Sequence, residues 1–231
     1  GKSCVSLTGA QAGILTDSVH GAARILSIDT ARIMRELDAG KIVVAAGFQG
    51  AERGGDTTTL GRGGSDTTAV ELAAALKADR CEIYSDVDGI YTADPRLVTG
   101  AVRLDSIDYG DMLHLALHGS QVLHSRSVEA AMRANVRVHL LSSFTRHEGT
   151  VMCKLDDRSG LCGVTRDPSL GTVSIIGREA DAHVLAEAVA ALAHSDIIVT
   201  RTELFDGGCS LFVSPDRLLP ALEITHRRFF R

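Results

Sequence analysis

Residues 60–68 read LGRGGSDTT, and this stretch indicates the fold more clearly than any other part of the chain. Its glycines, Gly61, Gly63 and Gly64, let the backbone approach an anion closely and direct N–H groups toward it. The Ala- and Leu-rich residues 68–77 that follow predict a helix, which Thr67 opens. Because the N-terminus of a helix favours negative charge, the stretch predicts an anion-binding turn between a strand and a helix.

Two charged residues stand within this turn. Arg62 provides a cationic fork that suits a carboxylate or a phosphate. Asp66 is the only acid of the turn, and its carboxylate could orient a metal, a substrate amine or a backbone amide. An ordinary strand-to-helix turn in which Asp66 caps the helix remains an alternative. The spacing fits neither the phosphate-binding GxxxxGK[ST] loop nor the dinucleotide GxGxxG loop.

Outward from the turn, short apolar runs alternate with helical segments. Strands are expected at residues 5–7, 41–46, 81–84 and 137–141, and helices at residues 28–37, 68–77, 108–117 and 127–134. The continuous apolar run 41–46 is typical of a buried parallel strand, and residues 54–59 suggest a polar hairpin. This alternation predicts an α/β layered fold with a largely parallel sheet.

The pattern changes near residue 150. Expected strands at 172–176, 197–204 and 209–213 and expected helices at 180–193 and 215–226 give the order β-α-β-β-α. That order predicts a small ferredoxin-like α+β module without its last strand, with the polar residues 154–159 as the boundary. The missing strand would leave an unpaired edge and an uncovered helix, which favours association with another chain.

A second polar segment, residues 85–96, reads SDVDGIYTADPR and follows an expected strand. Ligands of α/β sheets bind at such strand ends. Asp86 and Asp88 are close enough in sequence to act around a ribose or a metal, and Arg96 could meet phosphates. A pair of plain turns, Asp-Gly and Asp-Pro, is the alternative.

Bulk properties exclude several classes of protein. With 231 residues, 45% hydrophobic and 23% charged, the composition is that of a globular protein, and the net charge of −5 gives no reason to expect nucleic acid or an anionic membrane as partner. No apolar run is long enough for a membrane span, and the start of the sequence does not read as a signal peptide. The five cysteines form no CxxC pair, His114 and His118 lack the rest of a zinc motif, and no GxSxG elbow occurs.

Taken together, the motifs resemble aspartate kinases in order and in spacing. They are SLTGAQAG at 6–13, GFQG at 47–50, TTLGRGGSDTTA at 58–69, residues 85–96, SSF at 142–144 and GT at 149–150. The resemblance is dense over residues 4–151 and looser to the end. It implies a partial amino-acid kinase catalytic domain at residues 1–151 and an incomplete regulatory domain of the ACT type at residues 152–231. Kinases of the same fold that act on glutamate or carbamate lack the LGRGGSD block.

The resemblance implies phosphoryl transfer from ATP, with Mg²⁺, to the side-chain carboxylate of L-aspartate, the entry step to lysine, threonine and methionine. Arg62 and Asp66 would be the catalytic residues, with no protein-bound metal. The residues implied to bind aspartate are Phe48, Arg62, Gly63, Gly64, Ser65 and Asp66. The residues implied to bind the nucleotide are Ser85, Asp86, Tyr91, Arg96 and Gln121. A cytoplasmic homodimer is expected from the same resemblance.

The chain also departs from the family pattern. An upstream Lys-Phe-Gly-Gly strand is absent, Gln121 stands where the family has a lysine, and Ser125 replaces a proline. Residues 177–181 lack the proline loop at which an amino-acid effector would bind, which counts against such an effector. We therefore expect little turnover by these residues alone. A degenerate, non-catalytic kinase-like binding or regulatory subunit remains the alternative, and a different small-molecule kinase of this fold is disfavoured.

Overall fold

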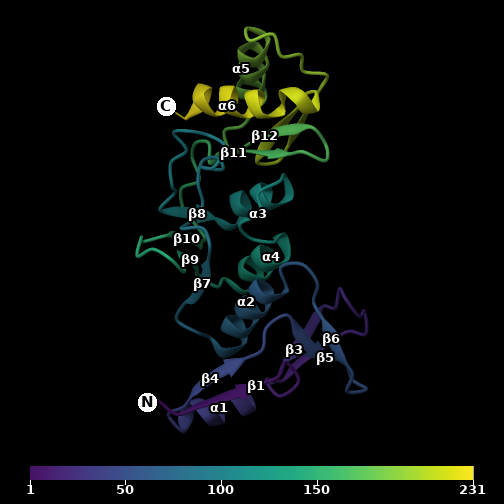
Figure 1. Cartoon of the computed structure of the whole chain (residues 1–231), viewed down its shortest axis with the longest axis vertical. Helices are drawn as coiled ribbons and strands as arrows, with labels where there is room; N and C mark the ends of the chain where they lie inside the picture. Colours follow the sequence, from purple (N-terminus) through teal and green to yellow (C-terminus); the bar gives the residue numbers. More distant parts are fainter. Residues whose placement is uncertain (231) are drawn as a thin grey trace. The chain divides into compact units, whose positions relative to one another are not determined.

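The computed structural model describes residues 1–230, which form two compact units (Figure 1). The first unit comprises Gly1–Ile83 and Arg126–Val138, and the second comprises Tyr84–Ser125 and His139–Arg231. These units follow contacts in space, so they are not the same division as the sequence domains expected at residues 1–151 and 152–231. That domain division stays a prediction.

The first unit contains two small sheets. Strand β1 (Cys4–Leu7) pairs in parallel with β4 (Ile42–Ala45). The other sheet has the order β3-β2-β5-β6, in which only the β2–β5 pair is parallel. Its strands are β2 (Ile14–Thr16), β3 (Ile25–Ile28), β5 (Gln49–Ala51) and β6 (Thr57–Thr59). The β5–β6 hairpin contains the polar stretch that the sequence predicted.

Helices α1 (Ala31–Asp38), α2 (Gly64–Leu76) and α4 (Ser125–Ala134) complete this unit, although the first residue of α4 is assigned to the other one. A core cluster forms around Leu7, Ile14 and Ile33. The expectation that residues 41–46 form a buried strand is wrong in part. The strand is parallel, but only one of its faces, that of Val43 and Ala45, packs against the core cluster, and on the other face Ile42 and Val44 are each 53% exposed.

A second mixed region follows strand β7 (Cys81–Ser85), which leads from the first unit into the second. Its sheet has the order β7-β9-β10-β8, with β8 (Ser106–Asp108) and β10 (Thr150–Cys153) parallel to each other. Strand β9 is Val138–Ser142, and helix α3 is Tyr109–Leu117. Asp108 begins α3 as a side-chain cap, with its Oδ1 accepting a hydrogen bond from the Gly110 N–H at 2.8 Å.

The C-terminal part is an antiparallel sheet of order β11-β12-β14-β13 with helices. Its elements are β11 (Gly163–Asp167), β12 (Thr172–Ile176), α5 (Ala182–Ala193), β13 (Arg201–Phe205), β14 (Gly208–Phe212), a 3₁₀ turn (Pro215–Arg217) and α6 (Leu218–Phe229). The sequence did not predict β11. It pairs with β12 at the edge that the missing last strand would have left unpaired, so the expectation of an unpaired edge is wrong at β12.

Both faces of this sheet are covered at β12, whereas β13 is largely exposed. Helices α5 and α6 pack together on it (Figure 1), and α3 also contacts β11 and β12. All five residues of β12 are therefore buried, the polar Ser174 included, whose Oγ lies 2.7 Å from the Ser210 Oγ. The expectation of an uncovered helix α6 is wrong as well, because Leu218, Ala221 and Leu222 are buried in the core.

The α/β class expected from the sequence is confirmed, with parallel strand pairs in the first part of the chain. The first part is nevertheless more mixed than expected, because two antiparallel hairpins accompany the parallel pairs. Among residues 1–230, no helix combines the length and the apolar character that crossing a bilayer requires.

Candidate active site

The glycine-rich turn before α2 requires glycine at each of its three glycine positions. Gly61 and Gly63 have φ angles of +77° and +70°, which L side chains rarely adopt. A Cβ at Gly61 would lie 2.7 Å from the Gly21 carbonyl oxygen, and one at Gly64 would lie 2.8 Å from the Phe48 ring. The turn is thus packed closely enough that its backbone, and not its side chains, determines the shape.

Helix α2 begins earlier than the sequence predicted. Its first residue is Gly64, so Ser65 and Asp66 lie in the first helical turn and their backbone N–H groups belong to the positive end of the helix. The residue that precedes the helix is Gly63, and no side chain caps it. The alternative in which Asp66 only caps the helix is therefore wrong, and its carboxylate is placed in the first turn instead.

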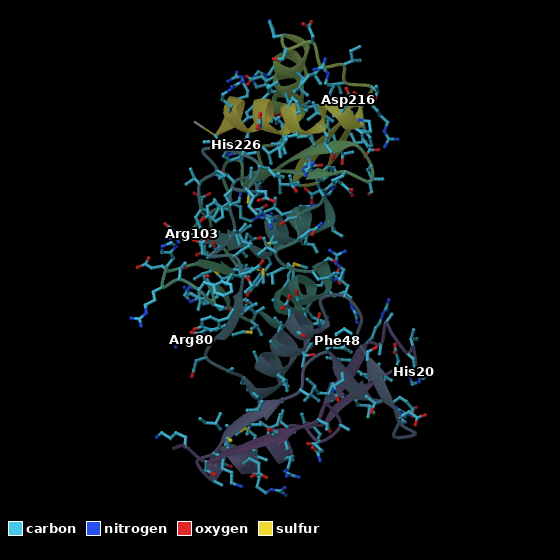
Figure 2. The ribbon with its side chains drawn as sticks, in the orientation of Figure 1. His20, Phe48, Arg80, Arg103, Asp216 and His226 are labelled. Atoms are coloured by element: carbon cyan, nitrogen blue, oxygen red, sulfur yellow. The ribbon has the colours of Figure 1, made fainter. Side chains whose placement is uncertain are left out.

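Phe48 is held against this turn by two backbone hydrogen bonds. Its N–H donates to Thr68 Oγ1 at 3.1 Å, and its carbonyl accepts from the Leu60 N–H at 2.9 Å. The residue has a φ of +70° and remains 41% exposed (Figure 2). Phe48 and residues 62–66, which the resemblance grouped as one binding site, are thus neighbours in the first unit.

The charged residues of the turn differ in exposure. Arg62 is exposed, and Asp66 is partly buried. Burial, and after it the negative charge of Asp66, raises the pKa of the nearby Cys81 thiol to about 11. The turn therefore combines a solvent-facing guanidinium, the positive end of a helix and one carboxylate within a short distance along the backbone.

A second group of predicted residues lines one cavity in the second unit. The cavity has a volume of about 490 Å³. The predicted nucleotide residues that line it are Ser85, Asp86, Tyr91, Arg96 and Gln121. Ser85 ends β7, Asp86, Tyr91 and Arg96 lie in the loop after it, and Gln121 lies in the connection between α3 and α4.

Asp88 organises the loop after β7. Its Oδ1 accepts a hydrogen bond from the Tyr91 hydroxyl at 2.9 Å, and its Oδ2 lies 2.7 Å from His147 Nδ1. These contacts, with His147 first, hold the pKa of Asp88 below its usual value. Burial, followed by the bond to Asp88, raises the pKa of Tyr91. Asp88 thus serves to fix Tyr91, and His147 is a residue that the sequence did not single out.

Arg96 is oriented by its neighbour Asp94. Its Nε and Nη2 atoms donate to the two carboxylate oxygens at 3.0 and 2.9 Å. The pair lowers the pKa of Asp94 and raises that of Arg96. Asp94 holds the Arg96 guanidinium by these two hydrogen bonds, and the Arg96 side chain is otherwise exposed. The guanidinium therefore remains accessible to an anion in the cavity.

Thr150 supports the same loop through hydrogen bonds of its hydroxyl group. Its hydroxyl accepts a hydrogen bond from the Ile90 N–H at 2.8 Å and lies 2.6 Å from the Leu104 carbonyl, to which it donates. The residue is fully buried. The motif Gly149-Thr150 was noted in the sequence without a role, and its structural role is to anchor the loop.

Part of the cavity wall comes from the C-terminal module. The sequence missed these residues, because it assigned them to a separate regulatory domain and gave β11 no strand. They are Val164, Thr165, Arg166, Pro168 and Leu222. In addition, Gly119, which precedes Gln121 by two positions, packs directly on the backbone of Arg166.

No group of three or more His, Cys, Asp or Glu residues within residues 1–230 is arranged to hold a metal ion. The two histidines of α3, His114 and His118, pack around Phe205 instead, and the His118 ring stacks on it with centroids 4.2 Å apart. Burial lowers the pKa of His114.

Comparison with known proteins shows which protein family this chain matches. The sequence profile of the Amino acid kinase family matches residues 1–142. An aspartate kinase of Stutzerimonas stutzeri is 55% identical over 159 residues, 69% of this chain and 39% of that protein. An aspartokinase of Geobacillus stearothermophilus is 46% identical over 202 residues, 86% of this chain and 50% of that protein. The chain thus spans half or less of the length of these relatives.

A solved structure extends the similarity to nearly the whole chain. The structure of E. coli aspartokinase III in complex with aspartate and ADP aligns with a TM-score of 0.64 at 29% identity. The alignment covers 97% of this chain and 54% of that chain.

Proposed function

The chain belongs to the amino acid kinase family, and from that premise we propose that it is part of an aspartate kinase. The reaction is phosphoryl transfer from MgATP to the side-chain carboxylate of L-aspartate, which gives 4-phospho-L-aspartate. This reaction would supply the synthesis of lysine, threonine and methionine.

One observation carries the proposal. The residues that the resemblance assigned to aspartate are neighbours around the turn before α2, and those assigned to the nucleotide line one cavity. In each group one residue joins a continuous segment from elsewhere in the sequence, Phe48 in the first and Gln121 in the second, which supports one ligand for each group. The similarity to aspartokinases, which covers both groups, supports the same assignment.

The turn before α2 suits a small zwitterion with two carboxylates. Arg62 would bind a substrate carboxylate with its fork, and the positive end of α2 adds N–H donors to that charge. Asp66 would receive the substrate amine. An aspartate carboxylate is ionised near pH 7, so its attack on a phosphoryl group needs no strong general base.

The cavity of the second unit suits MgATP. Tyr91 would pack beside the nucleotide, Ser85 and Asp86 would hold it, and Arg96 would reach its phosphates. Magnesium keeps several waters and binds through one or two carboxylates together with substrate phosphates. The exposed Asp86 can serve in that way, and no protein cage is required. Magnesium supplies charge neutralisation on the phosphates when it is bound.

Calorimetry of single-residue variants tests the proposal. We expect L-aspartate to bind the chain and to lose that binding in Arg62→Ala and in Asp66→Ala, while MgADP still binds both variants. Arg53→Ala is the matched control, because Arg53 is an exposed arginine in the β5–β6 hairpin of the same unit. A folded chain that binds neither ligand would refute the proposal.

Gln121 favours a second candidate function, that of a kinase-like protein which binds its ligands without transferring phosphate. Its uncharged side chain lines the nucleotide cavity where the family has a lysine. Removal of a preorganised positive group from a transferring phosphoryl group costs several kcal/mol of barrier, about 3 kcal/mol in comparable cases. Binding of both ligands without ADP production, in the full-length protein, would support this second candidate.

Association and location complete the proposal. We propose a homodimer in which the exposed edge strand β13 and the exposed Ile198 and Leu204 contact a second copy. An amino-acid effector at the ACT-type module would bind near residues 177–181, although the proline loop of the family is absent there. The cytoplasm is the proposed location, because ATP and free aspartate are metabolites of that compartment.

A further inference from the structure

We propose that Arg126, at the start of α4, is a positioning residue for the aspartate site. It would hold the glycine-rich turn in the shape that binds substrate, without touching substrate itself. The proposal rests on the function proposed above, which assigns that turn to aspartate. It adds a residue from helix α4, which neither the sequence motifs nor the comparisons connect to the turn.

Arg126 joins two loops that are far apart in sequence. Its Nη1 donates to the Leu60 carbonyl at 2.5 Å, and its Nη2 donates to the Ala23 carbonyl at 2.7 Å. Leu60 and Ala23 are both 0% exposed. A buried carbonyl that loses its donor is costly, so both loops depend on this one guanidinium. Charge-assisted donors arranged in a planar fork are also the strongest hydrogen-bond donors of proteins.

Leu60 connects Arg126 to the residues that are predicted to bind substrate. Its N–H donates to the Phe48 carbonyl at 2.9 Å, while its own carbonyl is the acceptor for Arg126. Leu60 also immediately precedes Gly61, where the positive φ of the turn begins. Arg126 therefore holds the carbonyl of the residue whose N–H bonds Phe48 and which directly precedes the turn 61–66.

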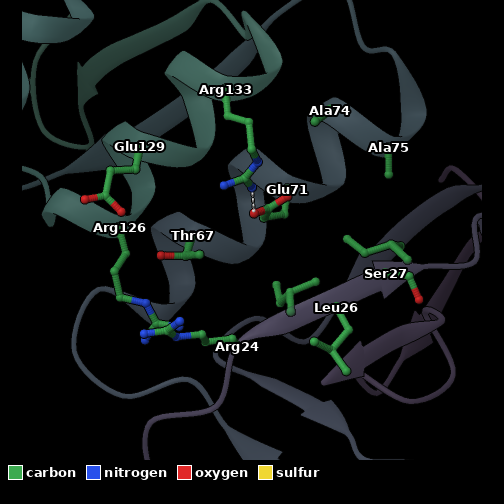
Figure 3. Close-up of a pocket in the computed structure, with 12 residues that line it drawn as sticks. Arg24, Leu26, Ser27, Thr67, Glu71, Ala74, Ala75, Arg126, Glu129 and Arg133 are labelled. Carbon is green, nitrogen blue, oxygen red and sulfur yellow. Dashed lines mark hydrogen bonds and ion pairs between the residues drawn. The ribbon is translucent and has the colours of Figure 1, made fainter. Parts of the chain in front are cut away.

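The second acceptor of Arg126, the Ala23 carbonyl, belongs to a segment that also contacts the turn. The Ala23 N–H donates to the Thr59 carbonyl at 2.9 Å, and the Gly21 carbonyl lies against Gly61. The backbone of residues 21–23 thus packs against the turn. Arg126 links this segment to Leu60, because it donates a hydrogen bond to each of them. Figure 3 shows the Arg126 side chain extending from α4 toward Arg24, the residue that precedes β3.

Arg126 also lines a cavity of about 720 Å³ in the first unit, which gives small solutes access to it. Arg133 lines the same cavity from the same helix, and its Nη2 pairs with Glu71 Oε1 of α2 at 2.5 Å (Figure 3). Arg133 is 65% exposed at its side chain and bonds no loop carbonyl among the described residues. It is therefore a matched control for an arginine that joins α4 to its neighbours.

The test compares Arg126→Ala and Arg126→Lys with Arg133→Ala in the whole chain. We expect both Arg126 variants to bind L-aspartate about tenfold more weakly, since one charged hydrogen-bond pair is lost, and to bind MgADP as the native chain does. Lysine should not restore binding, because an ammonium cannot reproduce the two-pronged fork. In Arg126→Ala, methylguanidinium at non-denaturing concentration should recover part of the affinity. Arg133→Ala should leave aspartate binding unchanged.

Amide hydrogen exchange gives a readout that needs no ligand. The N–H groups of Ala23 and Leu60 should exchange faster in Arg126→Lys than in the native chain and stay slow in Arg133→Ala. Equal aspartate affinity in all variants, or unchanged exchange at these two amides, would overturn the positioning role. If the native chain itself fails to bind aspartate, the proposed function fails, whereas the exchange comparison still decides whether Arg126 holds the turn.

Discussion

Thr150 shows how one hydroxyl can determine the order of a binding loop. It accepts from the Ile90 N–H and donates to the Leu104 carbonyl, and it is fully buried between them. A Cβ at Gly89 would lie only 2.6 Å from its Oγ1, so the loop rests directly on this side chain. The residues before and after Ile90 that are proposed to bind the nucleotide therefore share one support.

We expect Thr150→Val, which keeps the shape and removes the hydroxyl, to lower the free energy of unfolding by about 1–3 kcal/mol, because two buried backbone groups lose their partner. The affinity for MgADP should fall as well. Urea unfolding and calorimetry measure the two effects. Thr202→Val, at an exposed position of β13, is the control and should change neither. Unchanged stability and affinity in Thr150→Val would show that the loop has another support.

His226 makes stability depend on pH in a defined direction. Its Nε2 lies 2.8 Å from Thr92 Oγ1, its ring stacks on Phe230, and burial lowers its pKa from 6.5. The unfolded chain therefore takes up this proton at a higher pH than the folded chain does. The contribution to stability is complete above pH 6.5 and is lost as the pH falls below it.

Native protein should consequently lose more stability between about pH 7.5 and about pH 5.5 than His226→Gln, which cannot titrate there. Urea unfolding at the two pH values measures the difference. All other histidines are present in both proteins, so the comparison isolates His226. A native chain that gained stability relative to the variant at the lower pH would mean that the pKa is raised instead.

At the scale of elements, the turn before α2 and the β5–β6 hairpin offer two glycines with similar backbone and different surroundings. Gly61 has a φ of +77° and Gly55 a φ of +98°. A Cβ at Gly61 would meet the Gly21 carbonyl oxygen at 2.7 Å, whereas one at Gly55 would meet no heavy atom within 4 Å.

Gly55→Ala should therefore cost only the strain of a positive φ, about 1 kcal/mol. Gly61→Ala should cost clearly more and should also weaken aspartate binding, because the backbone of the turn must shift. Thermal or urea unfolding and aspartate calorimetry check the pair. An equal loss of unfolding free energy in the two variants would mean that the backbone of the turn can shift freely, which its close packing contradicts.

Strand β11 illustrates what the sequence could not provide. Most segments expected from residue 172 onward are found close to their predicted places, for example β12 at Thr172–Ile176, but the strand expected from residue 197 begins only at Arg201. The run 163–167 is too polar to read as a buried strand, and its position is set by pairing with β12 and not by its own pattern. In the same way, α2 starts at Gly64 because left-handed Gly63 ends the turn, which composition does not reveal.

The importance of β11 can be measured through Val164, which is 2% exposed in the core of the C-terminal module. Val164→Ala should lower the free energy of unfolding by about 1–3 kcal/mol, since it removes buried methyl groups and leaves a cavity. Val102→Ala, at a position that is 61% exposed, should cost little and serves as the control. Similar small losses at both sites would indicate that β11 is not part of the stable core.

For the whole molecule, the motifs assign residues to two sites, and that assignment stays a prediction, whereas the contacts that support those residues came only from the structure. Ser85, Asp86 and Arg96 were named from one continuous segment. His147, Thr150 and Arg126 were not, because each acts across a long separation in sequence through a contact that only the folded chain creates. Separate ligand sites in the two units are the central claim of this account.

Nuclear magnetic resonance of the isotopically labelled chain tests that claim most directly. MgADP should shift amides of residues 85–96 and 119–122, and L-aspartate should shift those of residues 47–50 and 61–68, each without the other ligand. The claim would be contradicted if MgADP shifted the turn before α2 and left the cavity residues unchanged, or if neither ligand shifted any amide of a folded sample.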